Sequence, residues 1–151
     1  MKNFNNINEI LDFAMGAEQR AVDLYSGLAD NAKIEDMKKV FRQFAKEEMG
    51  HKAKLMKIKE EGVLSIPDEK VMDMKIADYS GDIKATENMD YQDALLFAMS
   101  QEKAAFKLYS ALAEKSPTQD LSKAFHSLAQ EEAKHKLRFE LEYDEFVLRD
   151  N

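Results

Sequence analysis

The sequence contains no cysteine and no tryptophan, and only five of its 151 residues are glycine and two are proline. The absence of cysteine excludes disulfides, thiolate zinc sites, thiol catalysis and cysteine-ligated iron–sulfur or rubredoxin-type centres. The scarcity of glycine and proline argues against a turn-rich all-β domain, and the wealth of Glu, Lys, Ala, Leu and Met favours helices. We therefore expect an all-α protein, and the length suits a single domain over residues 1–151.

Positive charge is also in short supply, because 22 basic residues face 29 acidic ones and leave a formal charge of −7. Such a balance does not suit a nucleic-acid surface. No apolar run reaches the ~18 residues of a membrane span, and the first residues, MKNFN, lack the apolar core of a signal peptide. The sequence thus predicts a cytoplasmic protein that binds neither nucleic acid nor membrane.

The chain repeats itself at an offset of 84 residues. Segment 18–29 matches segment 102–113 at seven of twelve positions, and segment 41–55 matches segment 125–139 at six of fifteen. One offset shared by two separate segments predicts a duplicated architecture, in which each half is one helical hairpin.

Periodicity and punctuation place four helices at about 6–30, 34–61, 90–115 and 116–149. Asn6 and Glu9 have the spacing of a capping pair, Gly62 follows the second helix, and Ser116 is expected to cap a helix that begins at Pro117. The first hairpin (about 6–61) and the second (about 90–149) are joined by a long crossover, residues 62–89. Short loops within hairpins and one long crossover are typical of the ferritin-like antiparallel four-helix bundle.

Polar residues interrupt the apolar seams of all four helices. The seam of the second helix contains, at heptad spacing, Met37, Phe41, Phe44, Glu48, His51, Leu55 and Ile58. Glu132 and His135 interrupt the fourth helix in the same way, and Glu18 and Glu102 interrupt the first and third. Four acids in one buried layer would repel one another and lose their hydration, so a compensating charge is required.

The interrupting residues also share one height in the predicted bundle. Glu18 and Glu48 are equidistant from the first loop, and Glu102 and Glu132 are equidistant from the second. Glu and His three residues apart lie on one helix face and can converge on one ion. The sequence thus predicts a two-metal site formed by Glu18, Glu48, His51, Glu102, Glu132 and His135. Mixed oxygen and imidazole ligands suit two iron ions, with manganese or zinc as substitutes.

Four further residues near this layer are open to two interpretations each. Tyr25 and Tyr109 lie two turns beyond Glu18 and Glu102, and either fill the core or hydrogen-bond to a metal-bound carboxylate and so assist catalysis. Glu47 and Glu131 precede ligand glutamates. They could orient a facing histidine, but their place at the bundle edge favours solvent exposure.

With these residues in place, the chain resembles the rubrerythrin-like branch of the ferritin-like di-iron carboxylate superfamily. The resemblance implies that Glu48 and Glu132 bridge two irons and that the remaining four are terminal ligands: Glu18, Glu102, His51 and His135. It also implies an activity, because members of this family reduce hydrogen peroxide or dioxygen, or oxidise ferrous iron.

Two departures from the family pattern bear on the reaction. Full-length rubrerythrins carry a cysteine-ligated rubredoxin domain, whereas this chain has no cysteine, so electrons must come from an external donor protein or from ferrous iron itself. Peroxide-reducing members also have an additional glutamate on the third helix, and here the neighbouring turns carry Met99, Ala105 and Phe106. The symmetric six-ligand set is closer to bacterioferritin-type centres.

The sequence leaves three functions to be weighed. The leading prediction is a non-haem di-iron oxidoreductase, a peroxidase or oxidase that reduces hydrogen peroxide or dioxygen with electrons from an external donor, and we expect a homodimer. The first alternative is a ferroxidase for iron storage or detoxification in a ferritin-like assembly. The second is a metal-free helical interaction module, which predicts no bound iron.

Overall fold

Four long helices carry most of the chain in the computed structural model, which describes residues 2–86 and 88–150. They are α1 (Ile7–Asn31), α2 (Glu35–Glu61), α4 (Tyr91–Lys115) and α5 (Gln119–Asp150). The predicted all-α class is confirmed, since the described part of the chain contains no strand and only one isolated bridge, Asn3–Lys75. Residues 1, 87 and 151 lie outside the described residues, and residue 87 belongs to the predicted crossover.

Local side-chain chemistry explains where the first helices begin and end. The Asn6 side chain accepts a hydrogen bond from the Glu9 backbone N–H at 3.0 Å, as the capping pair predicts. The Glu9 carboxylate accepts from the backbone of Asn5, one residue earlier than a reciprocal capping box would place it. Gly62 ends α2 with φ of 63°, a left-handed conformation that glycine adopts without steric cost.

The predicted start of the last helix was wrong by two residues. The helix α5 begins at Gln119, and Thr118 Oγ1 accepts from the backbone N–H of Leu121 at 3.2 Å. Ser116 does not cap α5, because its hydroxyl donates to the Leu112 carbonyl at 2.6 Å and closes the end of α4 instead. Pro117 therefore lies in the loop between the two helices.

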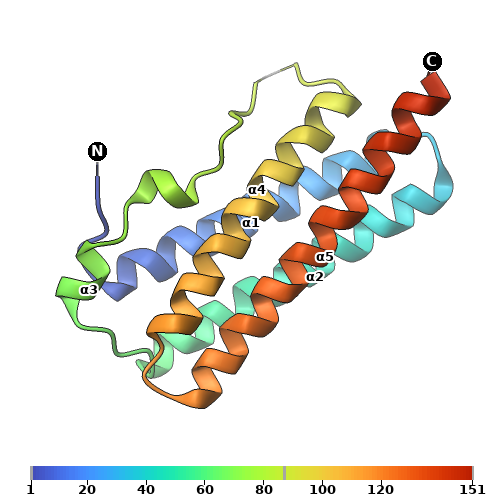
Figure 1. Cartoon of the computed structure of the whole chain (residues 1–151). Coiled ribbons are helices and arrows are strands. Elements are labelled where there is room, and N and C mark those ends of the chain that lie inside the picture. The colour runs from blue at the N-terminus through green and yellow to red at the C-terminus, as the bar shows by residue number, and fades with distance from the viewer. Residues whose placement is uncertain (1, 87, 151) are drawn as a thin grey trace.

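The helices pair as two antiparallel hairpins, α1 with α2 and α4 with α5 (Figure 1). The crossover leaves α2 at one end of the bundle and reaches α4 at the other (Figure 1). It contains a short helix, α3 (Asp68–Met72), and a 3₁₀ turn, η1 (Ile76–Tyr79), which the sequence did not predict. The N-terminal segment is tied to this crossover, because Phe4 N–H donates to the Met74 carbonyl at 3.1 Å.

Two hydrophobic cores fill the bundle on either side of its polar layer. The Tyr25 core lies toward the α1–α2 loop and includes Tyr25, Phe41, Leu95 and Phe139. The Tyr109 core lies toward the α4–α5 loop and includes Tyr109, Phe125, Leu55 and Leu11, together with the crossover residue Val71. No described helix is both long enough and apolar enough to cross a membrane.

Candidate metal centre

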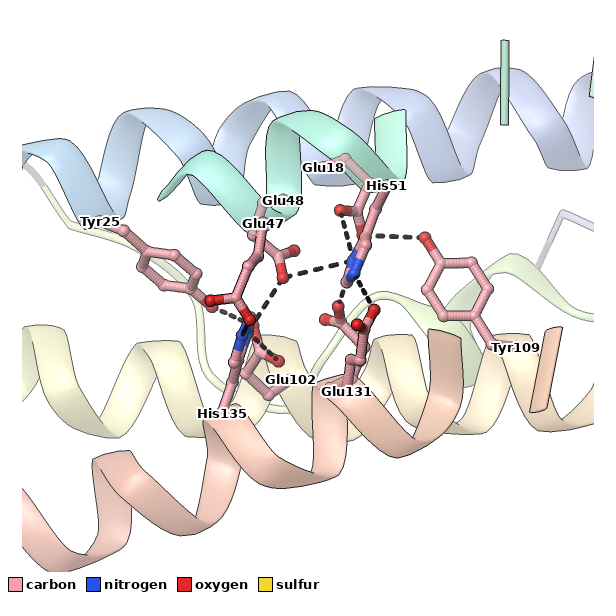
Figure 2. A network of polar contacts seen from close by, with 10 residues as sticks. Glu18, Tyr25, Glu47, Glu48, His51, Glu102, Tyr109, Glu131 and His135 are labelled. Carbon is pink, nitrogen blue, oxygen red and sulfur yellow. Dashed lines mark hydrogen bonds and ion pairs between the residues drawn. The ribbon is translucent and has the colours of Figure 1, made fainter. Parts of the chain in front are cut away.

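The six residues singled out as ligands lie together between the two cores. One comes from α1, one from α4 and two each from α2 and α5, and each is at most 5% exposed: Glu18, Glu48, His51, Glu102, Glu132 and His135. The seams explain this placement, because an a/d position faces the bundle interior whether its side chain is apolar or ionic. Figure 2 shows the side chains pointing toward one another from all four helices.

These residues form two overlapping groups that share two carboxylates. One group consists of Glu18, Glu48, His51 and Glu132, and the other of Glu48, Glu102, Glu132 and His135. Within each group, one potential ligand atom per residue lies within 4.8 Å of all the others. Two positions that share Glu48 and Glu132 are the arrangement that a pair of bridged cations needs.

Each of the six residues also directs one buried polar atom to the centre without a hydrogen-bond partner. These atoms are Glu18 Oε2, Glu48 Oε1, His51 Nδ1, Glu102 Oε2, Glu132 Oε1 and His135 Nδ1. His51 Nδ1 lies 2.8 Å from Glu132 Oε1, but the pair lacks the alignment of a hydrogen bond. Buried polar atoms without partners are rare because each costs free energy, so six around one centre indicate a site that fits cations.

The outer nitrogen of each imidazole contacts a glutamate from the opposite hairpin. His51 Nε2 lies 2.5 Å from Glu131 Oε2, and His135 Nε2 lies 3.3 Å from Glu47 Oε1. A carboxylate accepts and does not donate, so the neutral, metal-binding form of each imidazole would carry its proton on Nε2 and direct the Nδ1 lone pair to the centre. The side chains of Glu131 and Glu47 are 43% and 34% exposed, as their place at the bundle edge predicted. Each of them nevertheless also contacts and orients a histidine.

The two tyrosines hydrogen-bond across the bundle to candidate ligand glutamates of the other hairpin. Tyr109 on α4 donates to Glu18 Oε1 at 2.8 Å, and Tyr25 on α1 donates to Glu102 Oε1. They lie at opposite ends of the cluster (Figure 2). Of the two interpretations offered by the sequence, the hydrogen bond to a candidate ligand is the one observed. A part of the tyrosines in catalysis stays a prediction.

Burial raises the pKa of three of the four acids in this layer. It raises the pKa of Glu18 to about 8, and burial together with neighbouring glutamates raises the pKa of Glu102 and of Glu132 well above the ordinary value. Burial acts in the same sense on Glu48, but the close approach of the His135 imidazole and of neighbouring acids outweighs it and lowers the pKa of Glu48. The pKa of His51 is raised to about 9, since Glu18 and Glu48 stabilise its cation against the effect of burial.

This donor set fits a pair of divalent cations. Two such ions supply the four positive charges that match four carboxylates, and they occupy the lone pairs that lack partners. Carboxylate oxygens with one imidazole per ion suit iron or manganese, and the lack of thiolates argues against structural zinc.

One buried acid outside the centre was not predicted from the sequence. Glu142 is 1% exposed, and it accepts hydrogen bonds from Tyr91 at 2.7 Å and from Arg149 at 3.0 Å. The signal was present, because Glu142 lies three residues after Phe139 and continues the heptad seam of α5.

An open pocket of about 530 Å³ between α2 and α5 reaches the layer from outside. Its lining includes Phe44, Glu47, Glu131 and His135. The Phe44 ring stacks on the imidazole of His135, with centroids 3.9 Å apart. The pocket therefore reaches a candidate ligand directly, because His135 is part of its wall.

Comparisons with known proteins agree with this architecture. The family model described as Rubrerythrin matches residues 9–89 and 93–150. The fold is similar to the solved structure of a hypothetical protein from Pyrococcus furiosus, with a TM-score of 0.72 and 25% identity over 92% of this chain and 89% of that one. No curated protein matches. A family match over most of the chain, on a bundle that gathers four glutamates and two histidines, shows that this protein belongs to the rubrerythrin family.

Proposed function

We propose that the protein is a di-iron oxidoreductase that reduces hydrogen peroxide or dioxygen with electrons from an external donor. The observation that carries the proposal is the set of six buried ligand atoms that face one centre without partners. Membership of the rubrerythrin family supports the same chemistry. Both iron ions would be held by Glu48 and Glu132. Each ion would also be held by one further carboxylate and one imidazole.

The bound pair would supply two electrons to the O–O bond, one from each ferrous ion, so that hydrogen peroxide and two protons become two waters. The residues of the chain set the conditions for that reaction. Glu131 and Glu47 hold the imidazoles in the tautomer that presents Nδ1. Tyr109 and Tyr25 fix the terminal carboxylates, and the two cores limit the access of water.

Electrons would have to enter from another molecule, because the chain has no cysteine to hold a rubredoxin-type centre. The α2–α5 pocket supports an approach on that side, since it ends on His135 and on the glutamates that contact both imidazoles. A donor or a small oxidant seated there is one ring from the centre.

Rapid mixing tests the proposal directly. Protein loaded anaerobically with two Fe(II) per chain would be mixed with hydrogen peroxide and, separately, with dioxygen, while ferric absorbance is followed. We expect at least one oxidant to react much faster with the loaded protein than with free Fe(II). Oxidation of the bound iron at the rate of free Fe(II) by both reagents would refute an enzymatic role.

A ferroxidase of an iron-storing assembly is the second candidate. It is favoured by the symmetric ligand set, because the two metal-ligating groups found among the described residues contain six residues and no seventh carboxylate. Column sizing separates the candidates: a closed shell of many subunits supports storage, and a dimer argues against it.

A further inference from the structure

The unexplained feature of the Tyr25 core is the buried acid Glu142. A carboxylate away from water is destabilising unless it is paired and hydrogen-bonded. The duplicated position 84 residues earlier is Ile58, also buried, so an apolar residue fits the equivalent place in the bundle. Glu142 belongs to neither metal-ligating group. Its Oε2 accepts from Tyr91 and Arg149, while its Oε1 is buried without a partner.

Packed rings connect this acid to the metal centre. Tyr25, which donates to Glu102, lies 5.1 Å from Phe139 between ring centroids, and Phe139 lies 5.9 Å from Phe41. Phe41 in turn lies 6.2 Å from Tyr91. The path therefore runs from the hydroxyl on a candidate ligand to the Tyr91–Glu142 pair through side chains in contact.

The path ends at a pocket of about 380 Å³ at the α1–α2 loop end of the bundle. Its lining includes Lys33, Tyr91, Glu142, Phe146 and Arg149. Figure 1 shows why these residues meet: the α1–α2 loop, the start of α4 and the end of α5 lie at the same end. A reductant can therefore approach Tyr91 without entering the metal layer.

The other half of the duplication has no such path. Tyr109 lies 6.3 Å from Phe125, and no further ring contact is found from Phe125 within residues 2–86 and 88–150. The positions that correspond to Phe139 and Tyr91 at the offset of 84 are Leu55 and Ile7. The ligands are duplicated, whereas the route to a second tyrosine exists on one side.

We propose that Tyr91 is a redox-active residue that supplies an electron to the metal centre through these rings, with Glu142 as the acceptor of its phenolic proton. The proposal rests on the di-iron function above. Tyr91 suits this role better than Tyr25, because its hydrogen-bond acceptor is not a candidate ligand and because it lines a pocket. Burial and the hydrogen bond to Glu142 raise the pKa of Tyr91, so the phenol stays protonated until the electron leaves.

The step balances when hydrogen peroxide meets a mixed-valent iron pair, in which one ion is ferrous and the other is ferric. Peroxide needs two electrons and two protons to become two waters. The ferrous ion gives one electron, Tyr91 gives the other, and the two protons come from solvent. The phenolic proton of Tyr91 passes to Glu142 and leaves a neutral tyrosyl radical. A one-electron donor at the pocket then reduces the radical, and Glu142 returns the proton.

The test uses electron paramagnetic resonance of freeze-quenched samples. Iron-loaded protein would be titrated with dithionite to one electron per iron pair and mixed with hydrogen peroxide. We expect an organic radical whose line shape changes when the protein contains ring-deuterated tyrosine. The Tyr91→Phe variant, which keeps the ring contacts, should lower the radical yield at least tenfold. The control Tyr79→Phe, on η1 away from the path, should leave it unchanged.

Two further measurements separate this role from a structural one. Glu142→Gln keeps a hydrogen-bonding group but removes the proton acceptor, so we expect its radical yield to fall while its melting temperature shows that it folds. Spin trapping followed by peptide mass mapping should find the adduct on Tyr91. Oxidation of the iron without a radical, or an equal radical in Tyr91→Phe, would overturn the assignment and leave the di-iron function standing. Iron that is oxidised no faster than free Fe(II) would overturn both.

Discussion

The Tyr25 core and the Tyr109 core flank the same layer of acids but are built differently. In the Tyr109 core the rings of Tyr109 and Phe125 are joined by aliphatic residues and by the crossover. In the Tyr25 core the aromatic contacts continue through Phe139 and Phe41 to Tyr91. A duplicated bundle thus holds its candidate ligands at fixed seam positions, while the residues around them can serve different purposes.

The largest expected effect is the loss of metal from variants of the central glutamates, because both sides of the bundle share Glu48. Glu48 belongs to both ligand groups, whereas Glu18 belongs to one and Glu102 to the other. We therefore expect Glu48→Ala to lose both metals, and Glu18→Ala and Glu102→Ala to lose one each. Elemental analysis after dialysis measures this, with the exposed Glu60→Ala on the same helix as control. Equal stoichiometry in all four variants would contradict the shared layer.

The next largest effect compares packing in the two cores. Phe139 and Leu55 occupy equivalent positions and are both fully buried. Phe139→Ala should destabilise the metal-free protein by about 3–5 kcal/mol and Leu55→Ala by about 2–5 kcal/mol, because each leaves a cavity. Urea unfolding measures both. Only Phe139→Ala should also reduce the Tyr91 radical, and an equal reduction in Leu55→Ala would remove the distinction between the cores.

A smaller effect should distinguish the two histidine-orienting glutamates. Loss of a group that orients a ligand typically lowers metal affinity by about 10–100-fold. We expect Glu131→Ala to exceed Glu47→Ala, since Glu131 lies 2.5 Å from its imidazole and Glu47 lies 3.3 Å from its own. Competition with a chelator measures the affinity, with Glu60→Ala again as control. The reverse order would show that the shorter contact is not the stronger support.

The last expected effect is a dependence of stability on pH, which comes from the layer between the cores. The raised pKa values of Glu18 (from 4.5 to about 8) and His51 (from 6.5 to about 9) mean that the native metal-free protein binds more protons than the unfolded chain. Its stability is therefore greatest below about pH 5 with respect to these groups and falls as the pH rises to about 9.

We expect the loss to be at least the ~1.4 kcal/mol that one pKa unit represents. Urea unfolding at several pH values measures it. Metal-loaded protein should behave oppositely, because protons compete with the metal at low pH. A metal-free protein that gains stability between pH 5 and 9 would contradict the electrostatics of the layer.

Much of this structure follows from the sequence, because ligand residues on an a/d seam have only one direction to face. The offset of 84 and the seam through Glu48 and His51 were sufficient to predict the bundle and to bring six residues together. The tyrosine contacts could be predicted only as one of two alternatives, since Tyr25 and Tyr109 bond to the opposite hairpin and not to their own.

Other features depended on three-dimensional context that no local pattern contains. Ser116 has the spacing of a helix cap, but its hydroxyl bonds backwards to Leu112, and Thr118 takes the capping role. The turn η1 and the contact of Phe4 with Met74 arise where the crossover meets the N-terminal segment. Glu142 could have been predicted had the seam of α5 been extended by one further position.

The binding of two cations between the four glutamates is tested most directly by anomalous diffraction at the iron edge from crystals of the iron-loaded protein. We expect two peaks, one beside Glu18 and His51 and one beside Glu102 and His135, both within bonding distance of Glu48 and Glu132. A map with no peak in this layer, from a protein whose six side chains still converge, would contradict it.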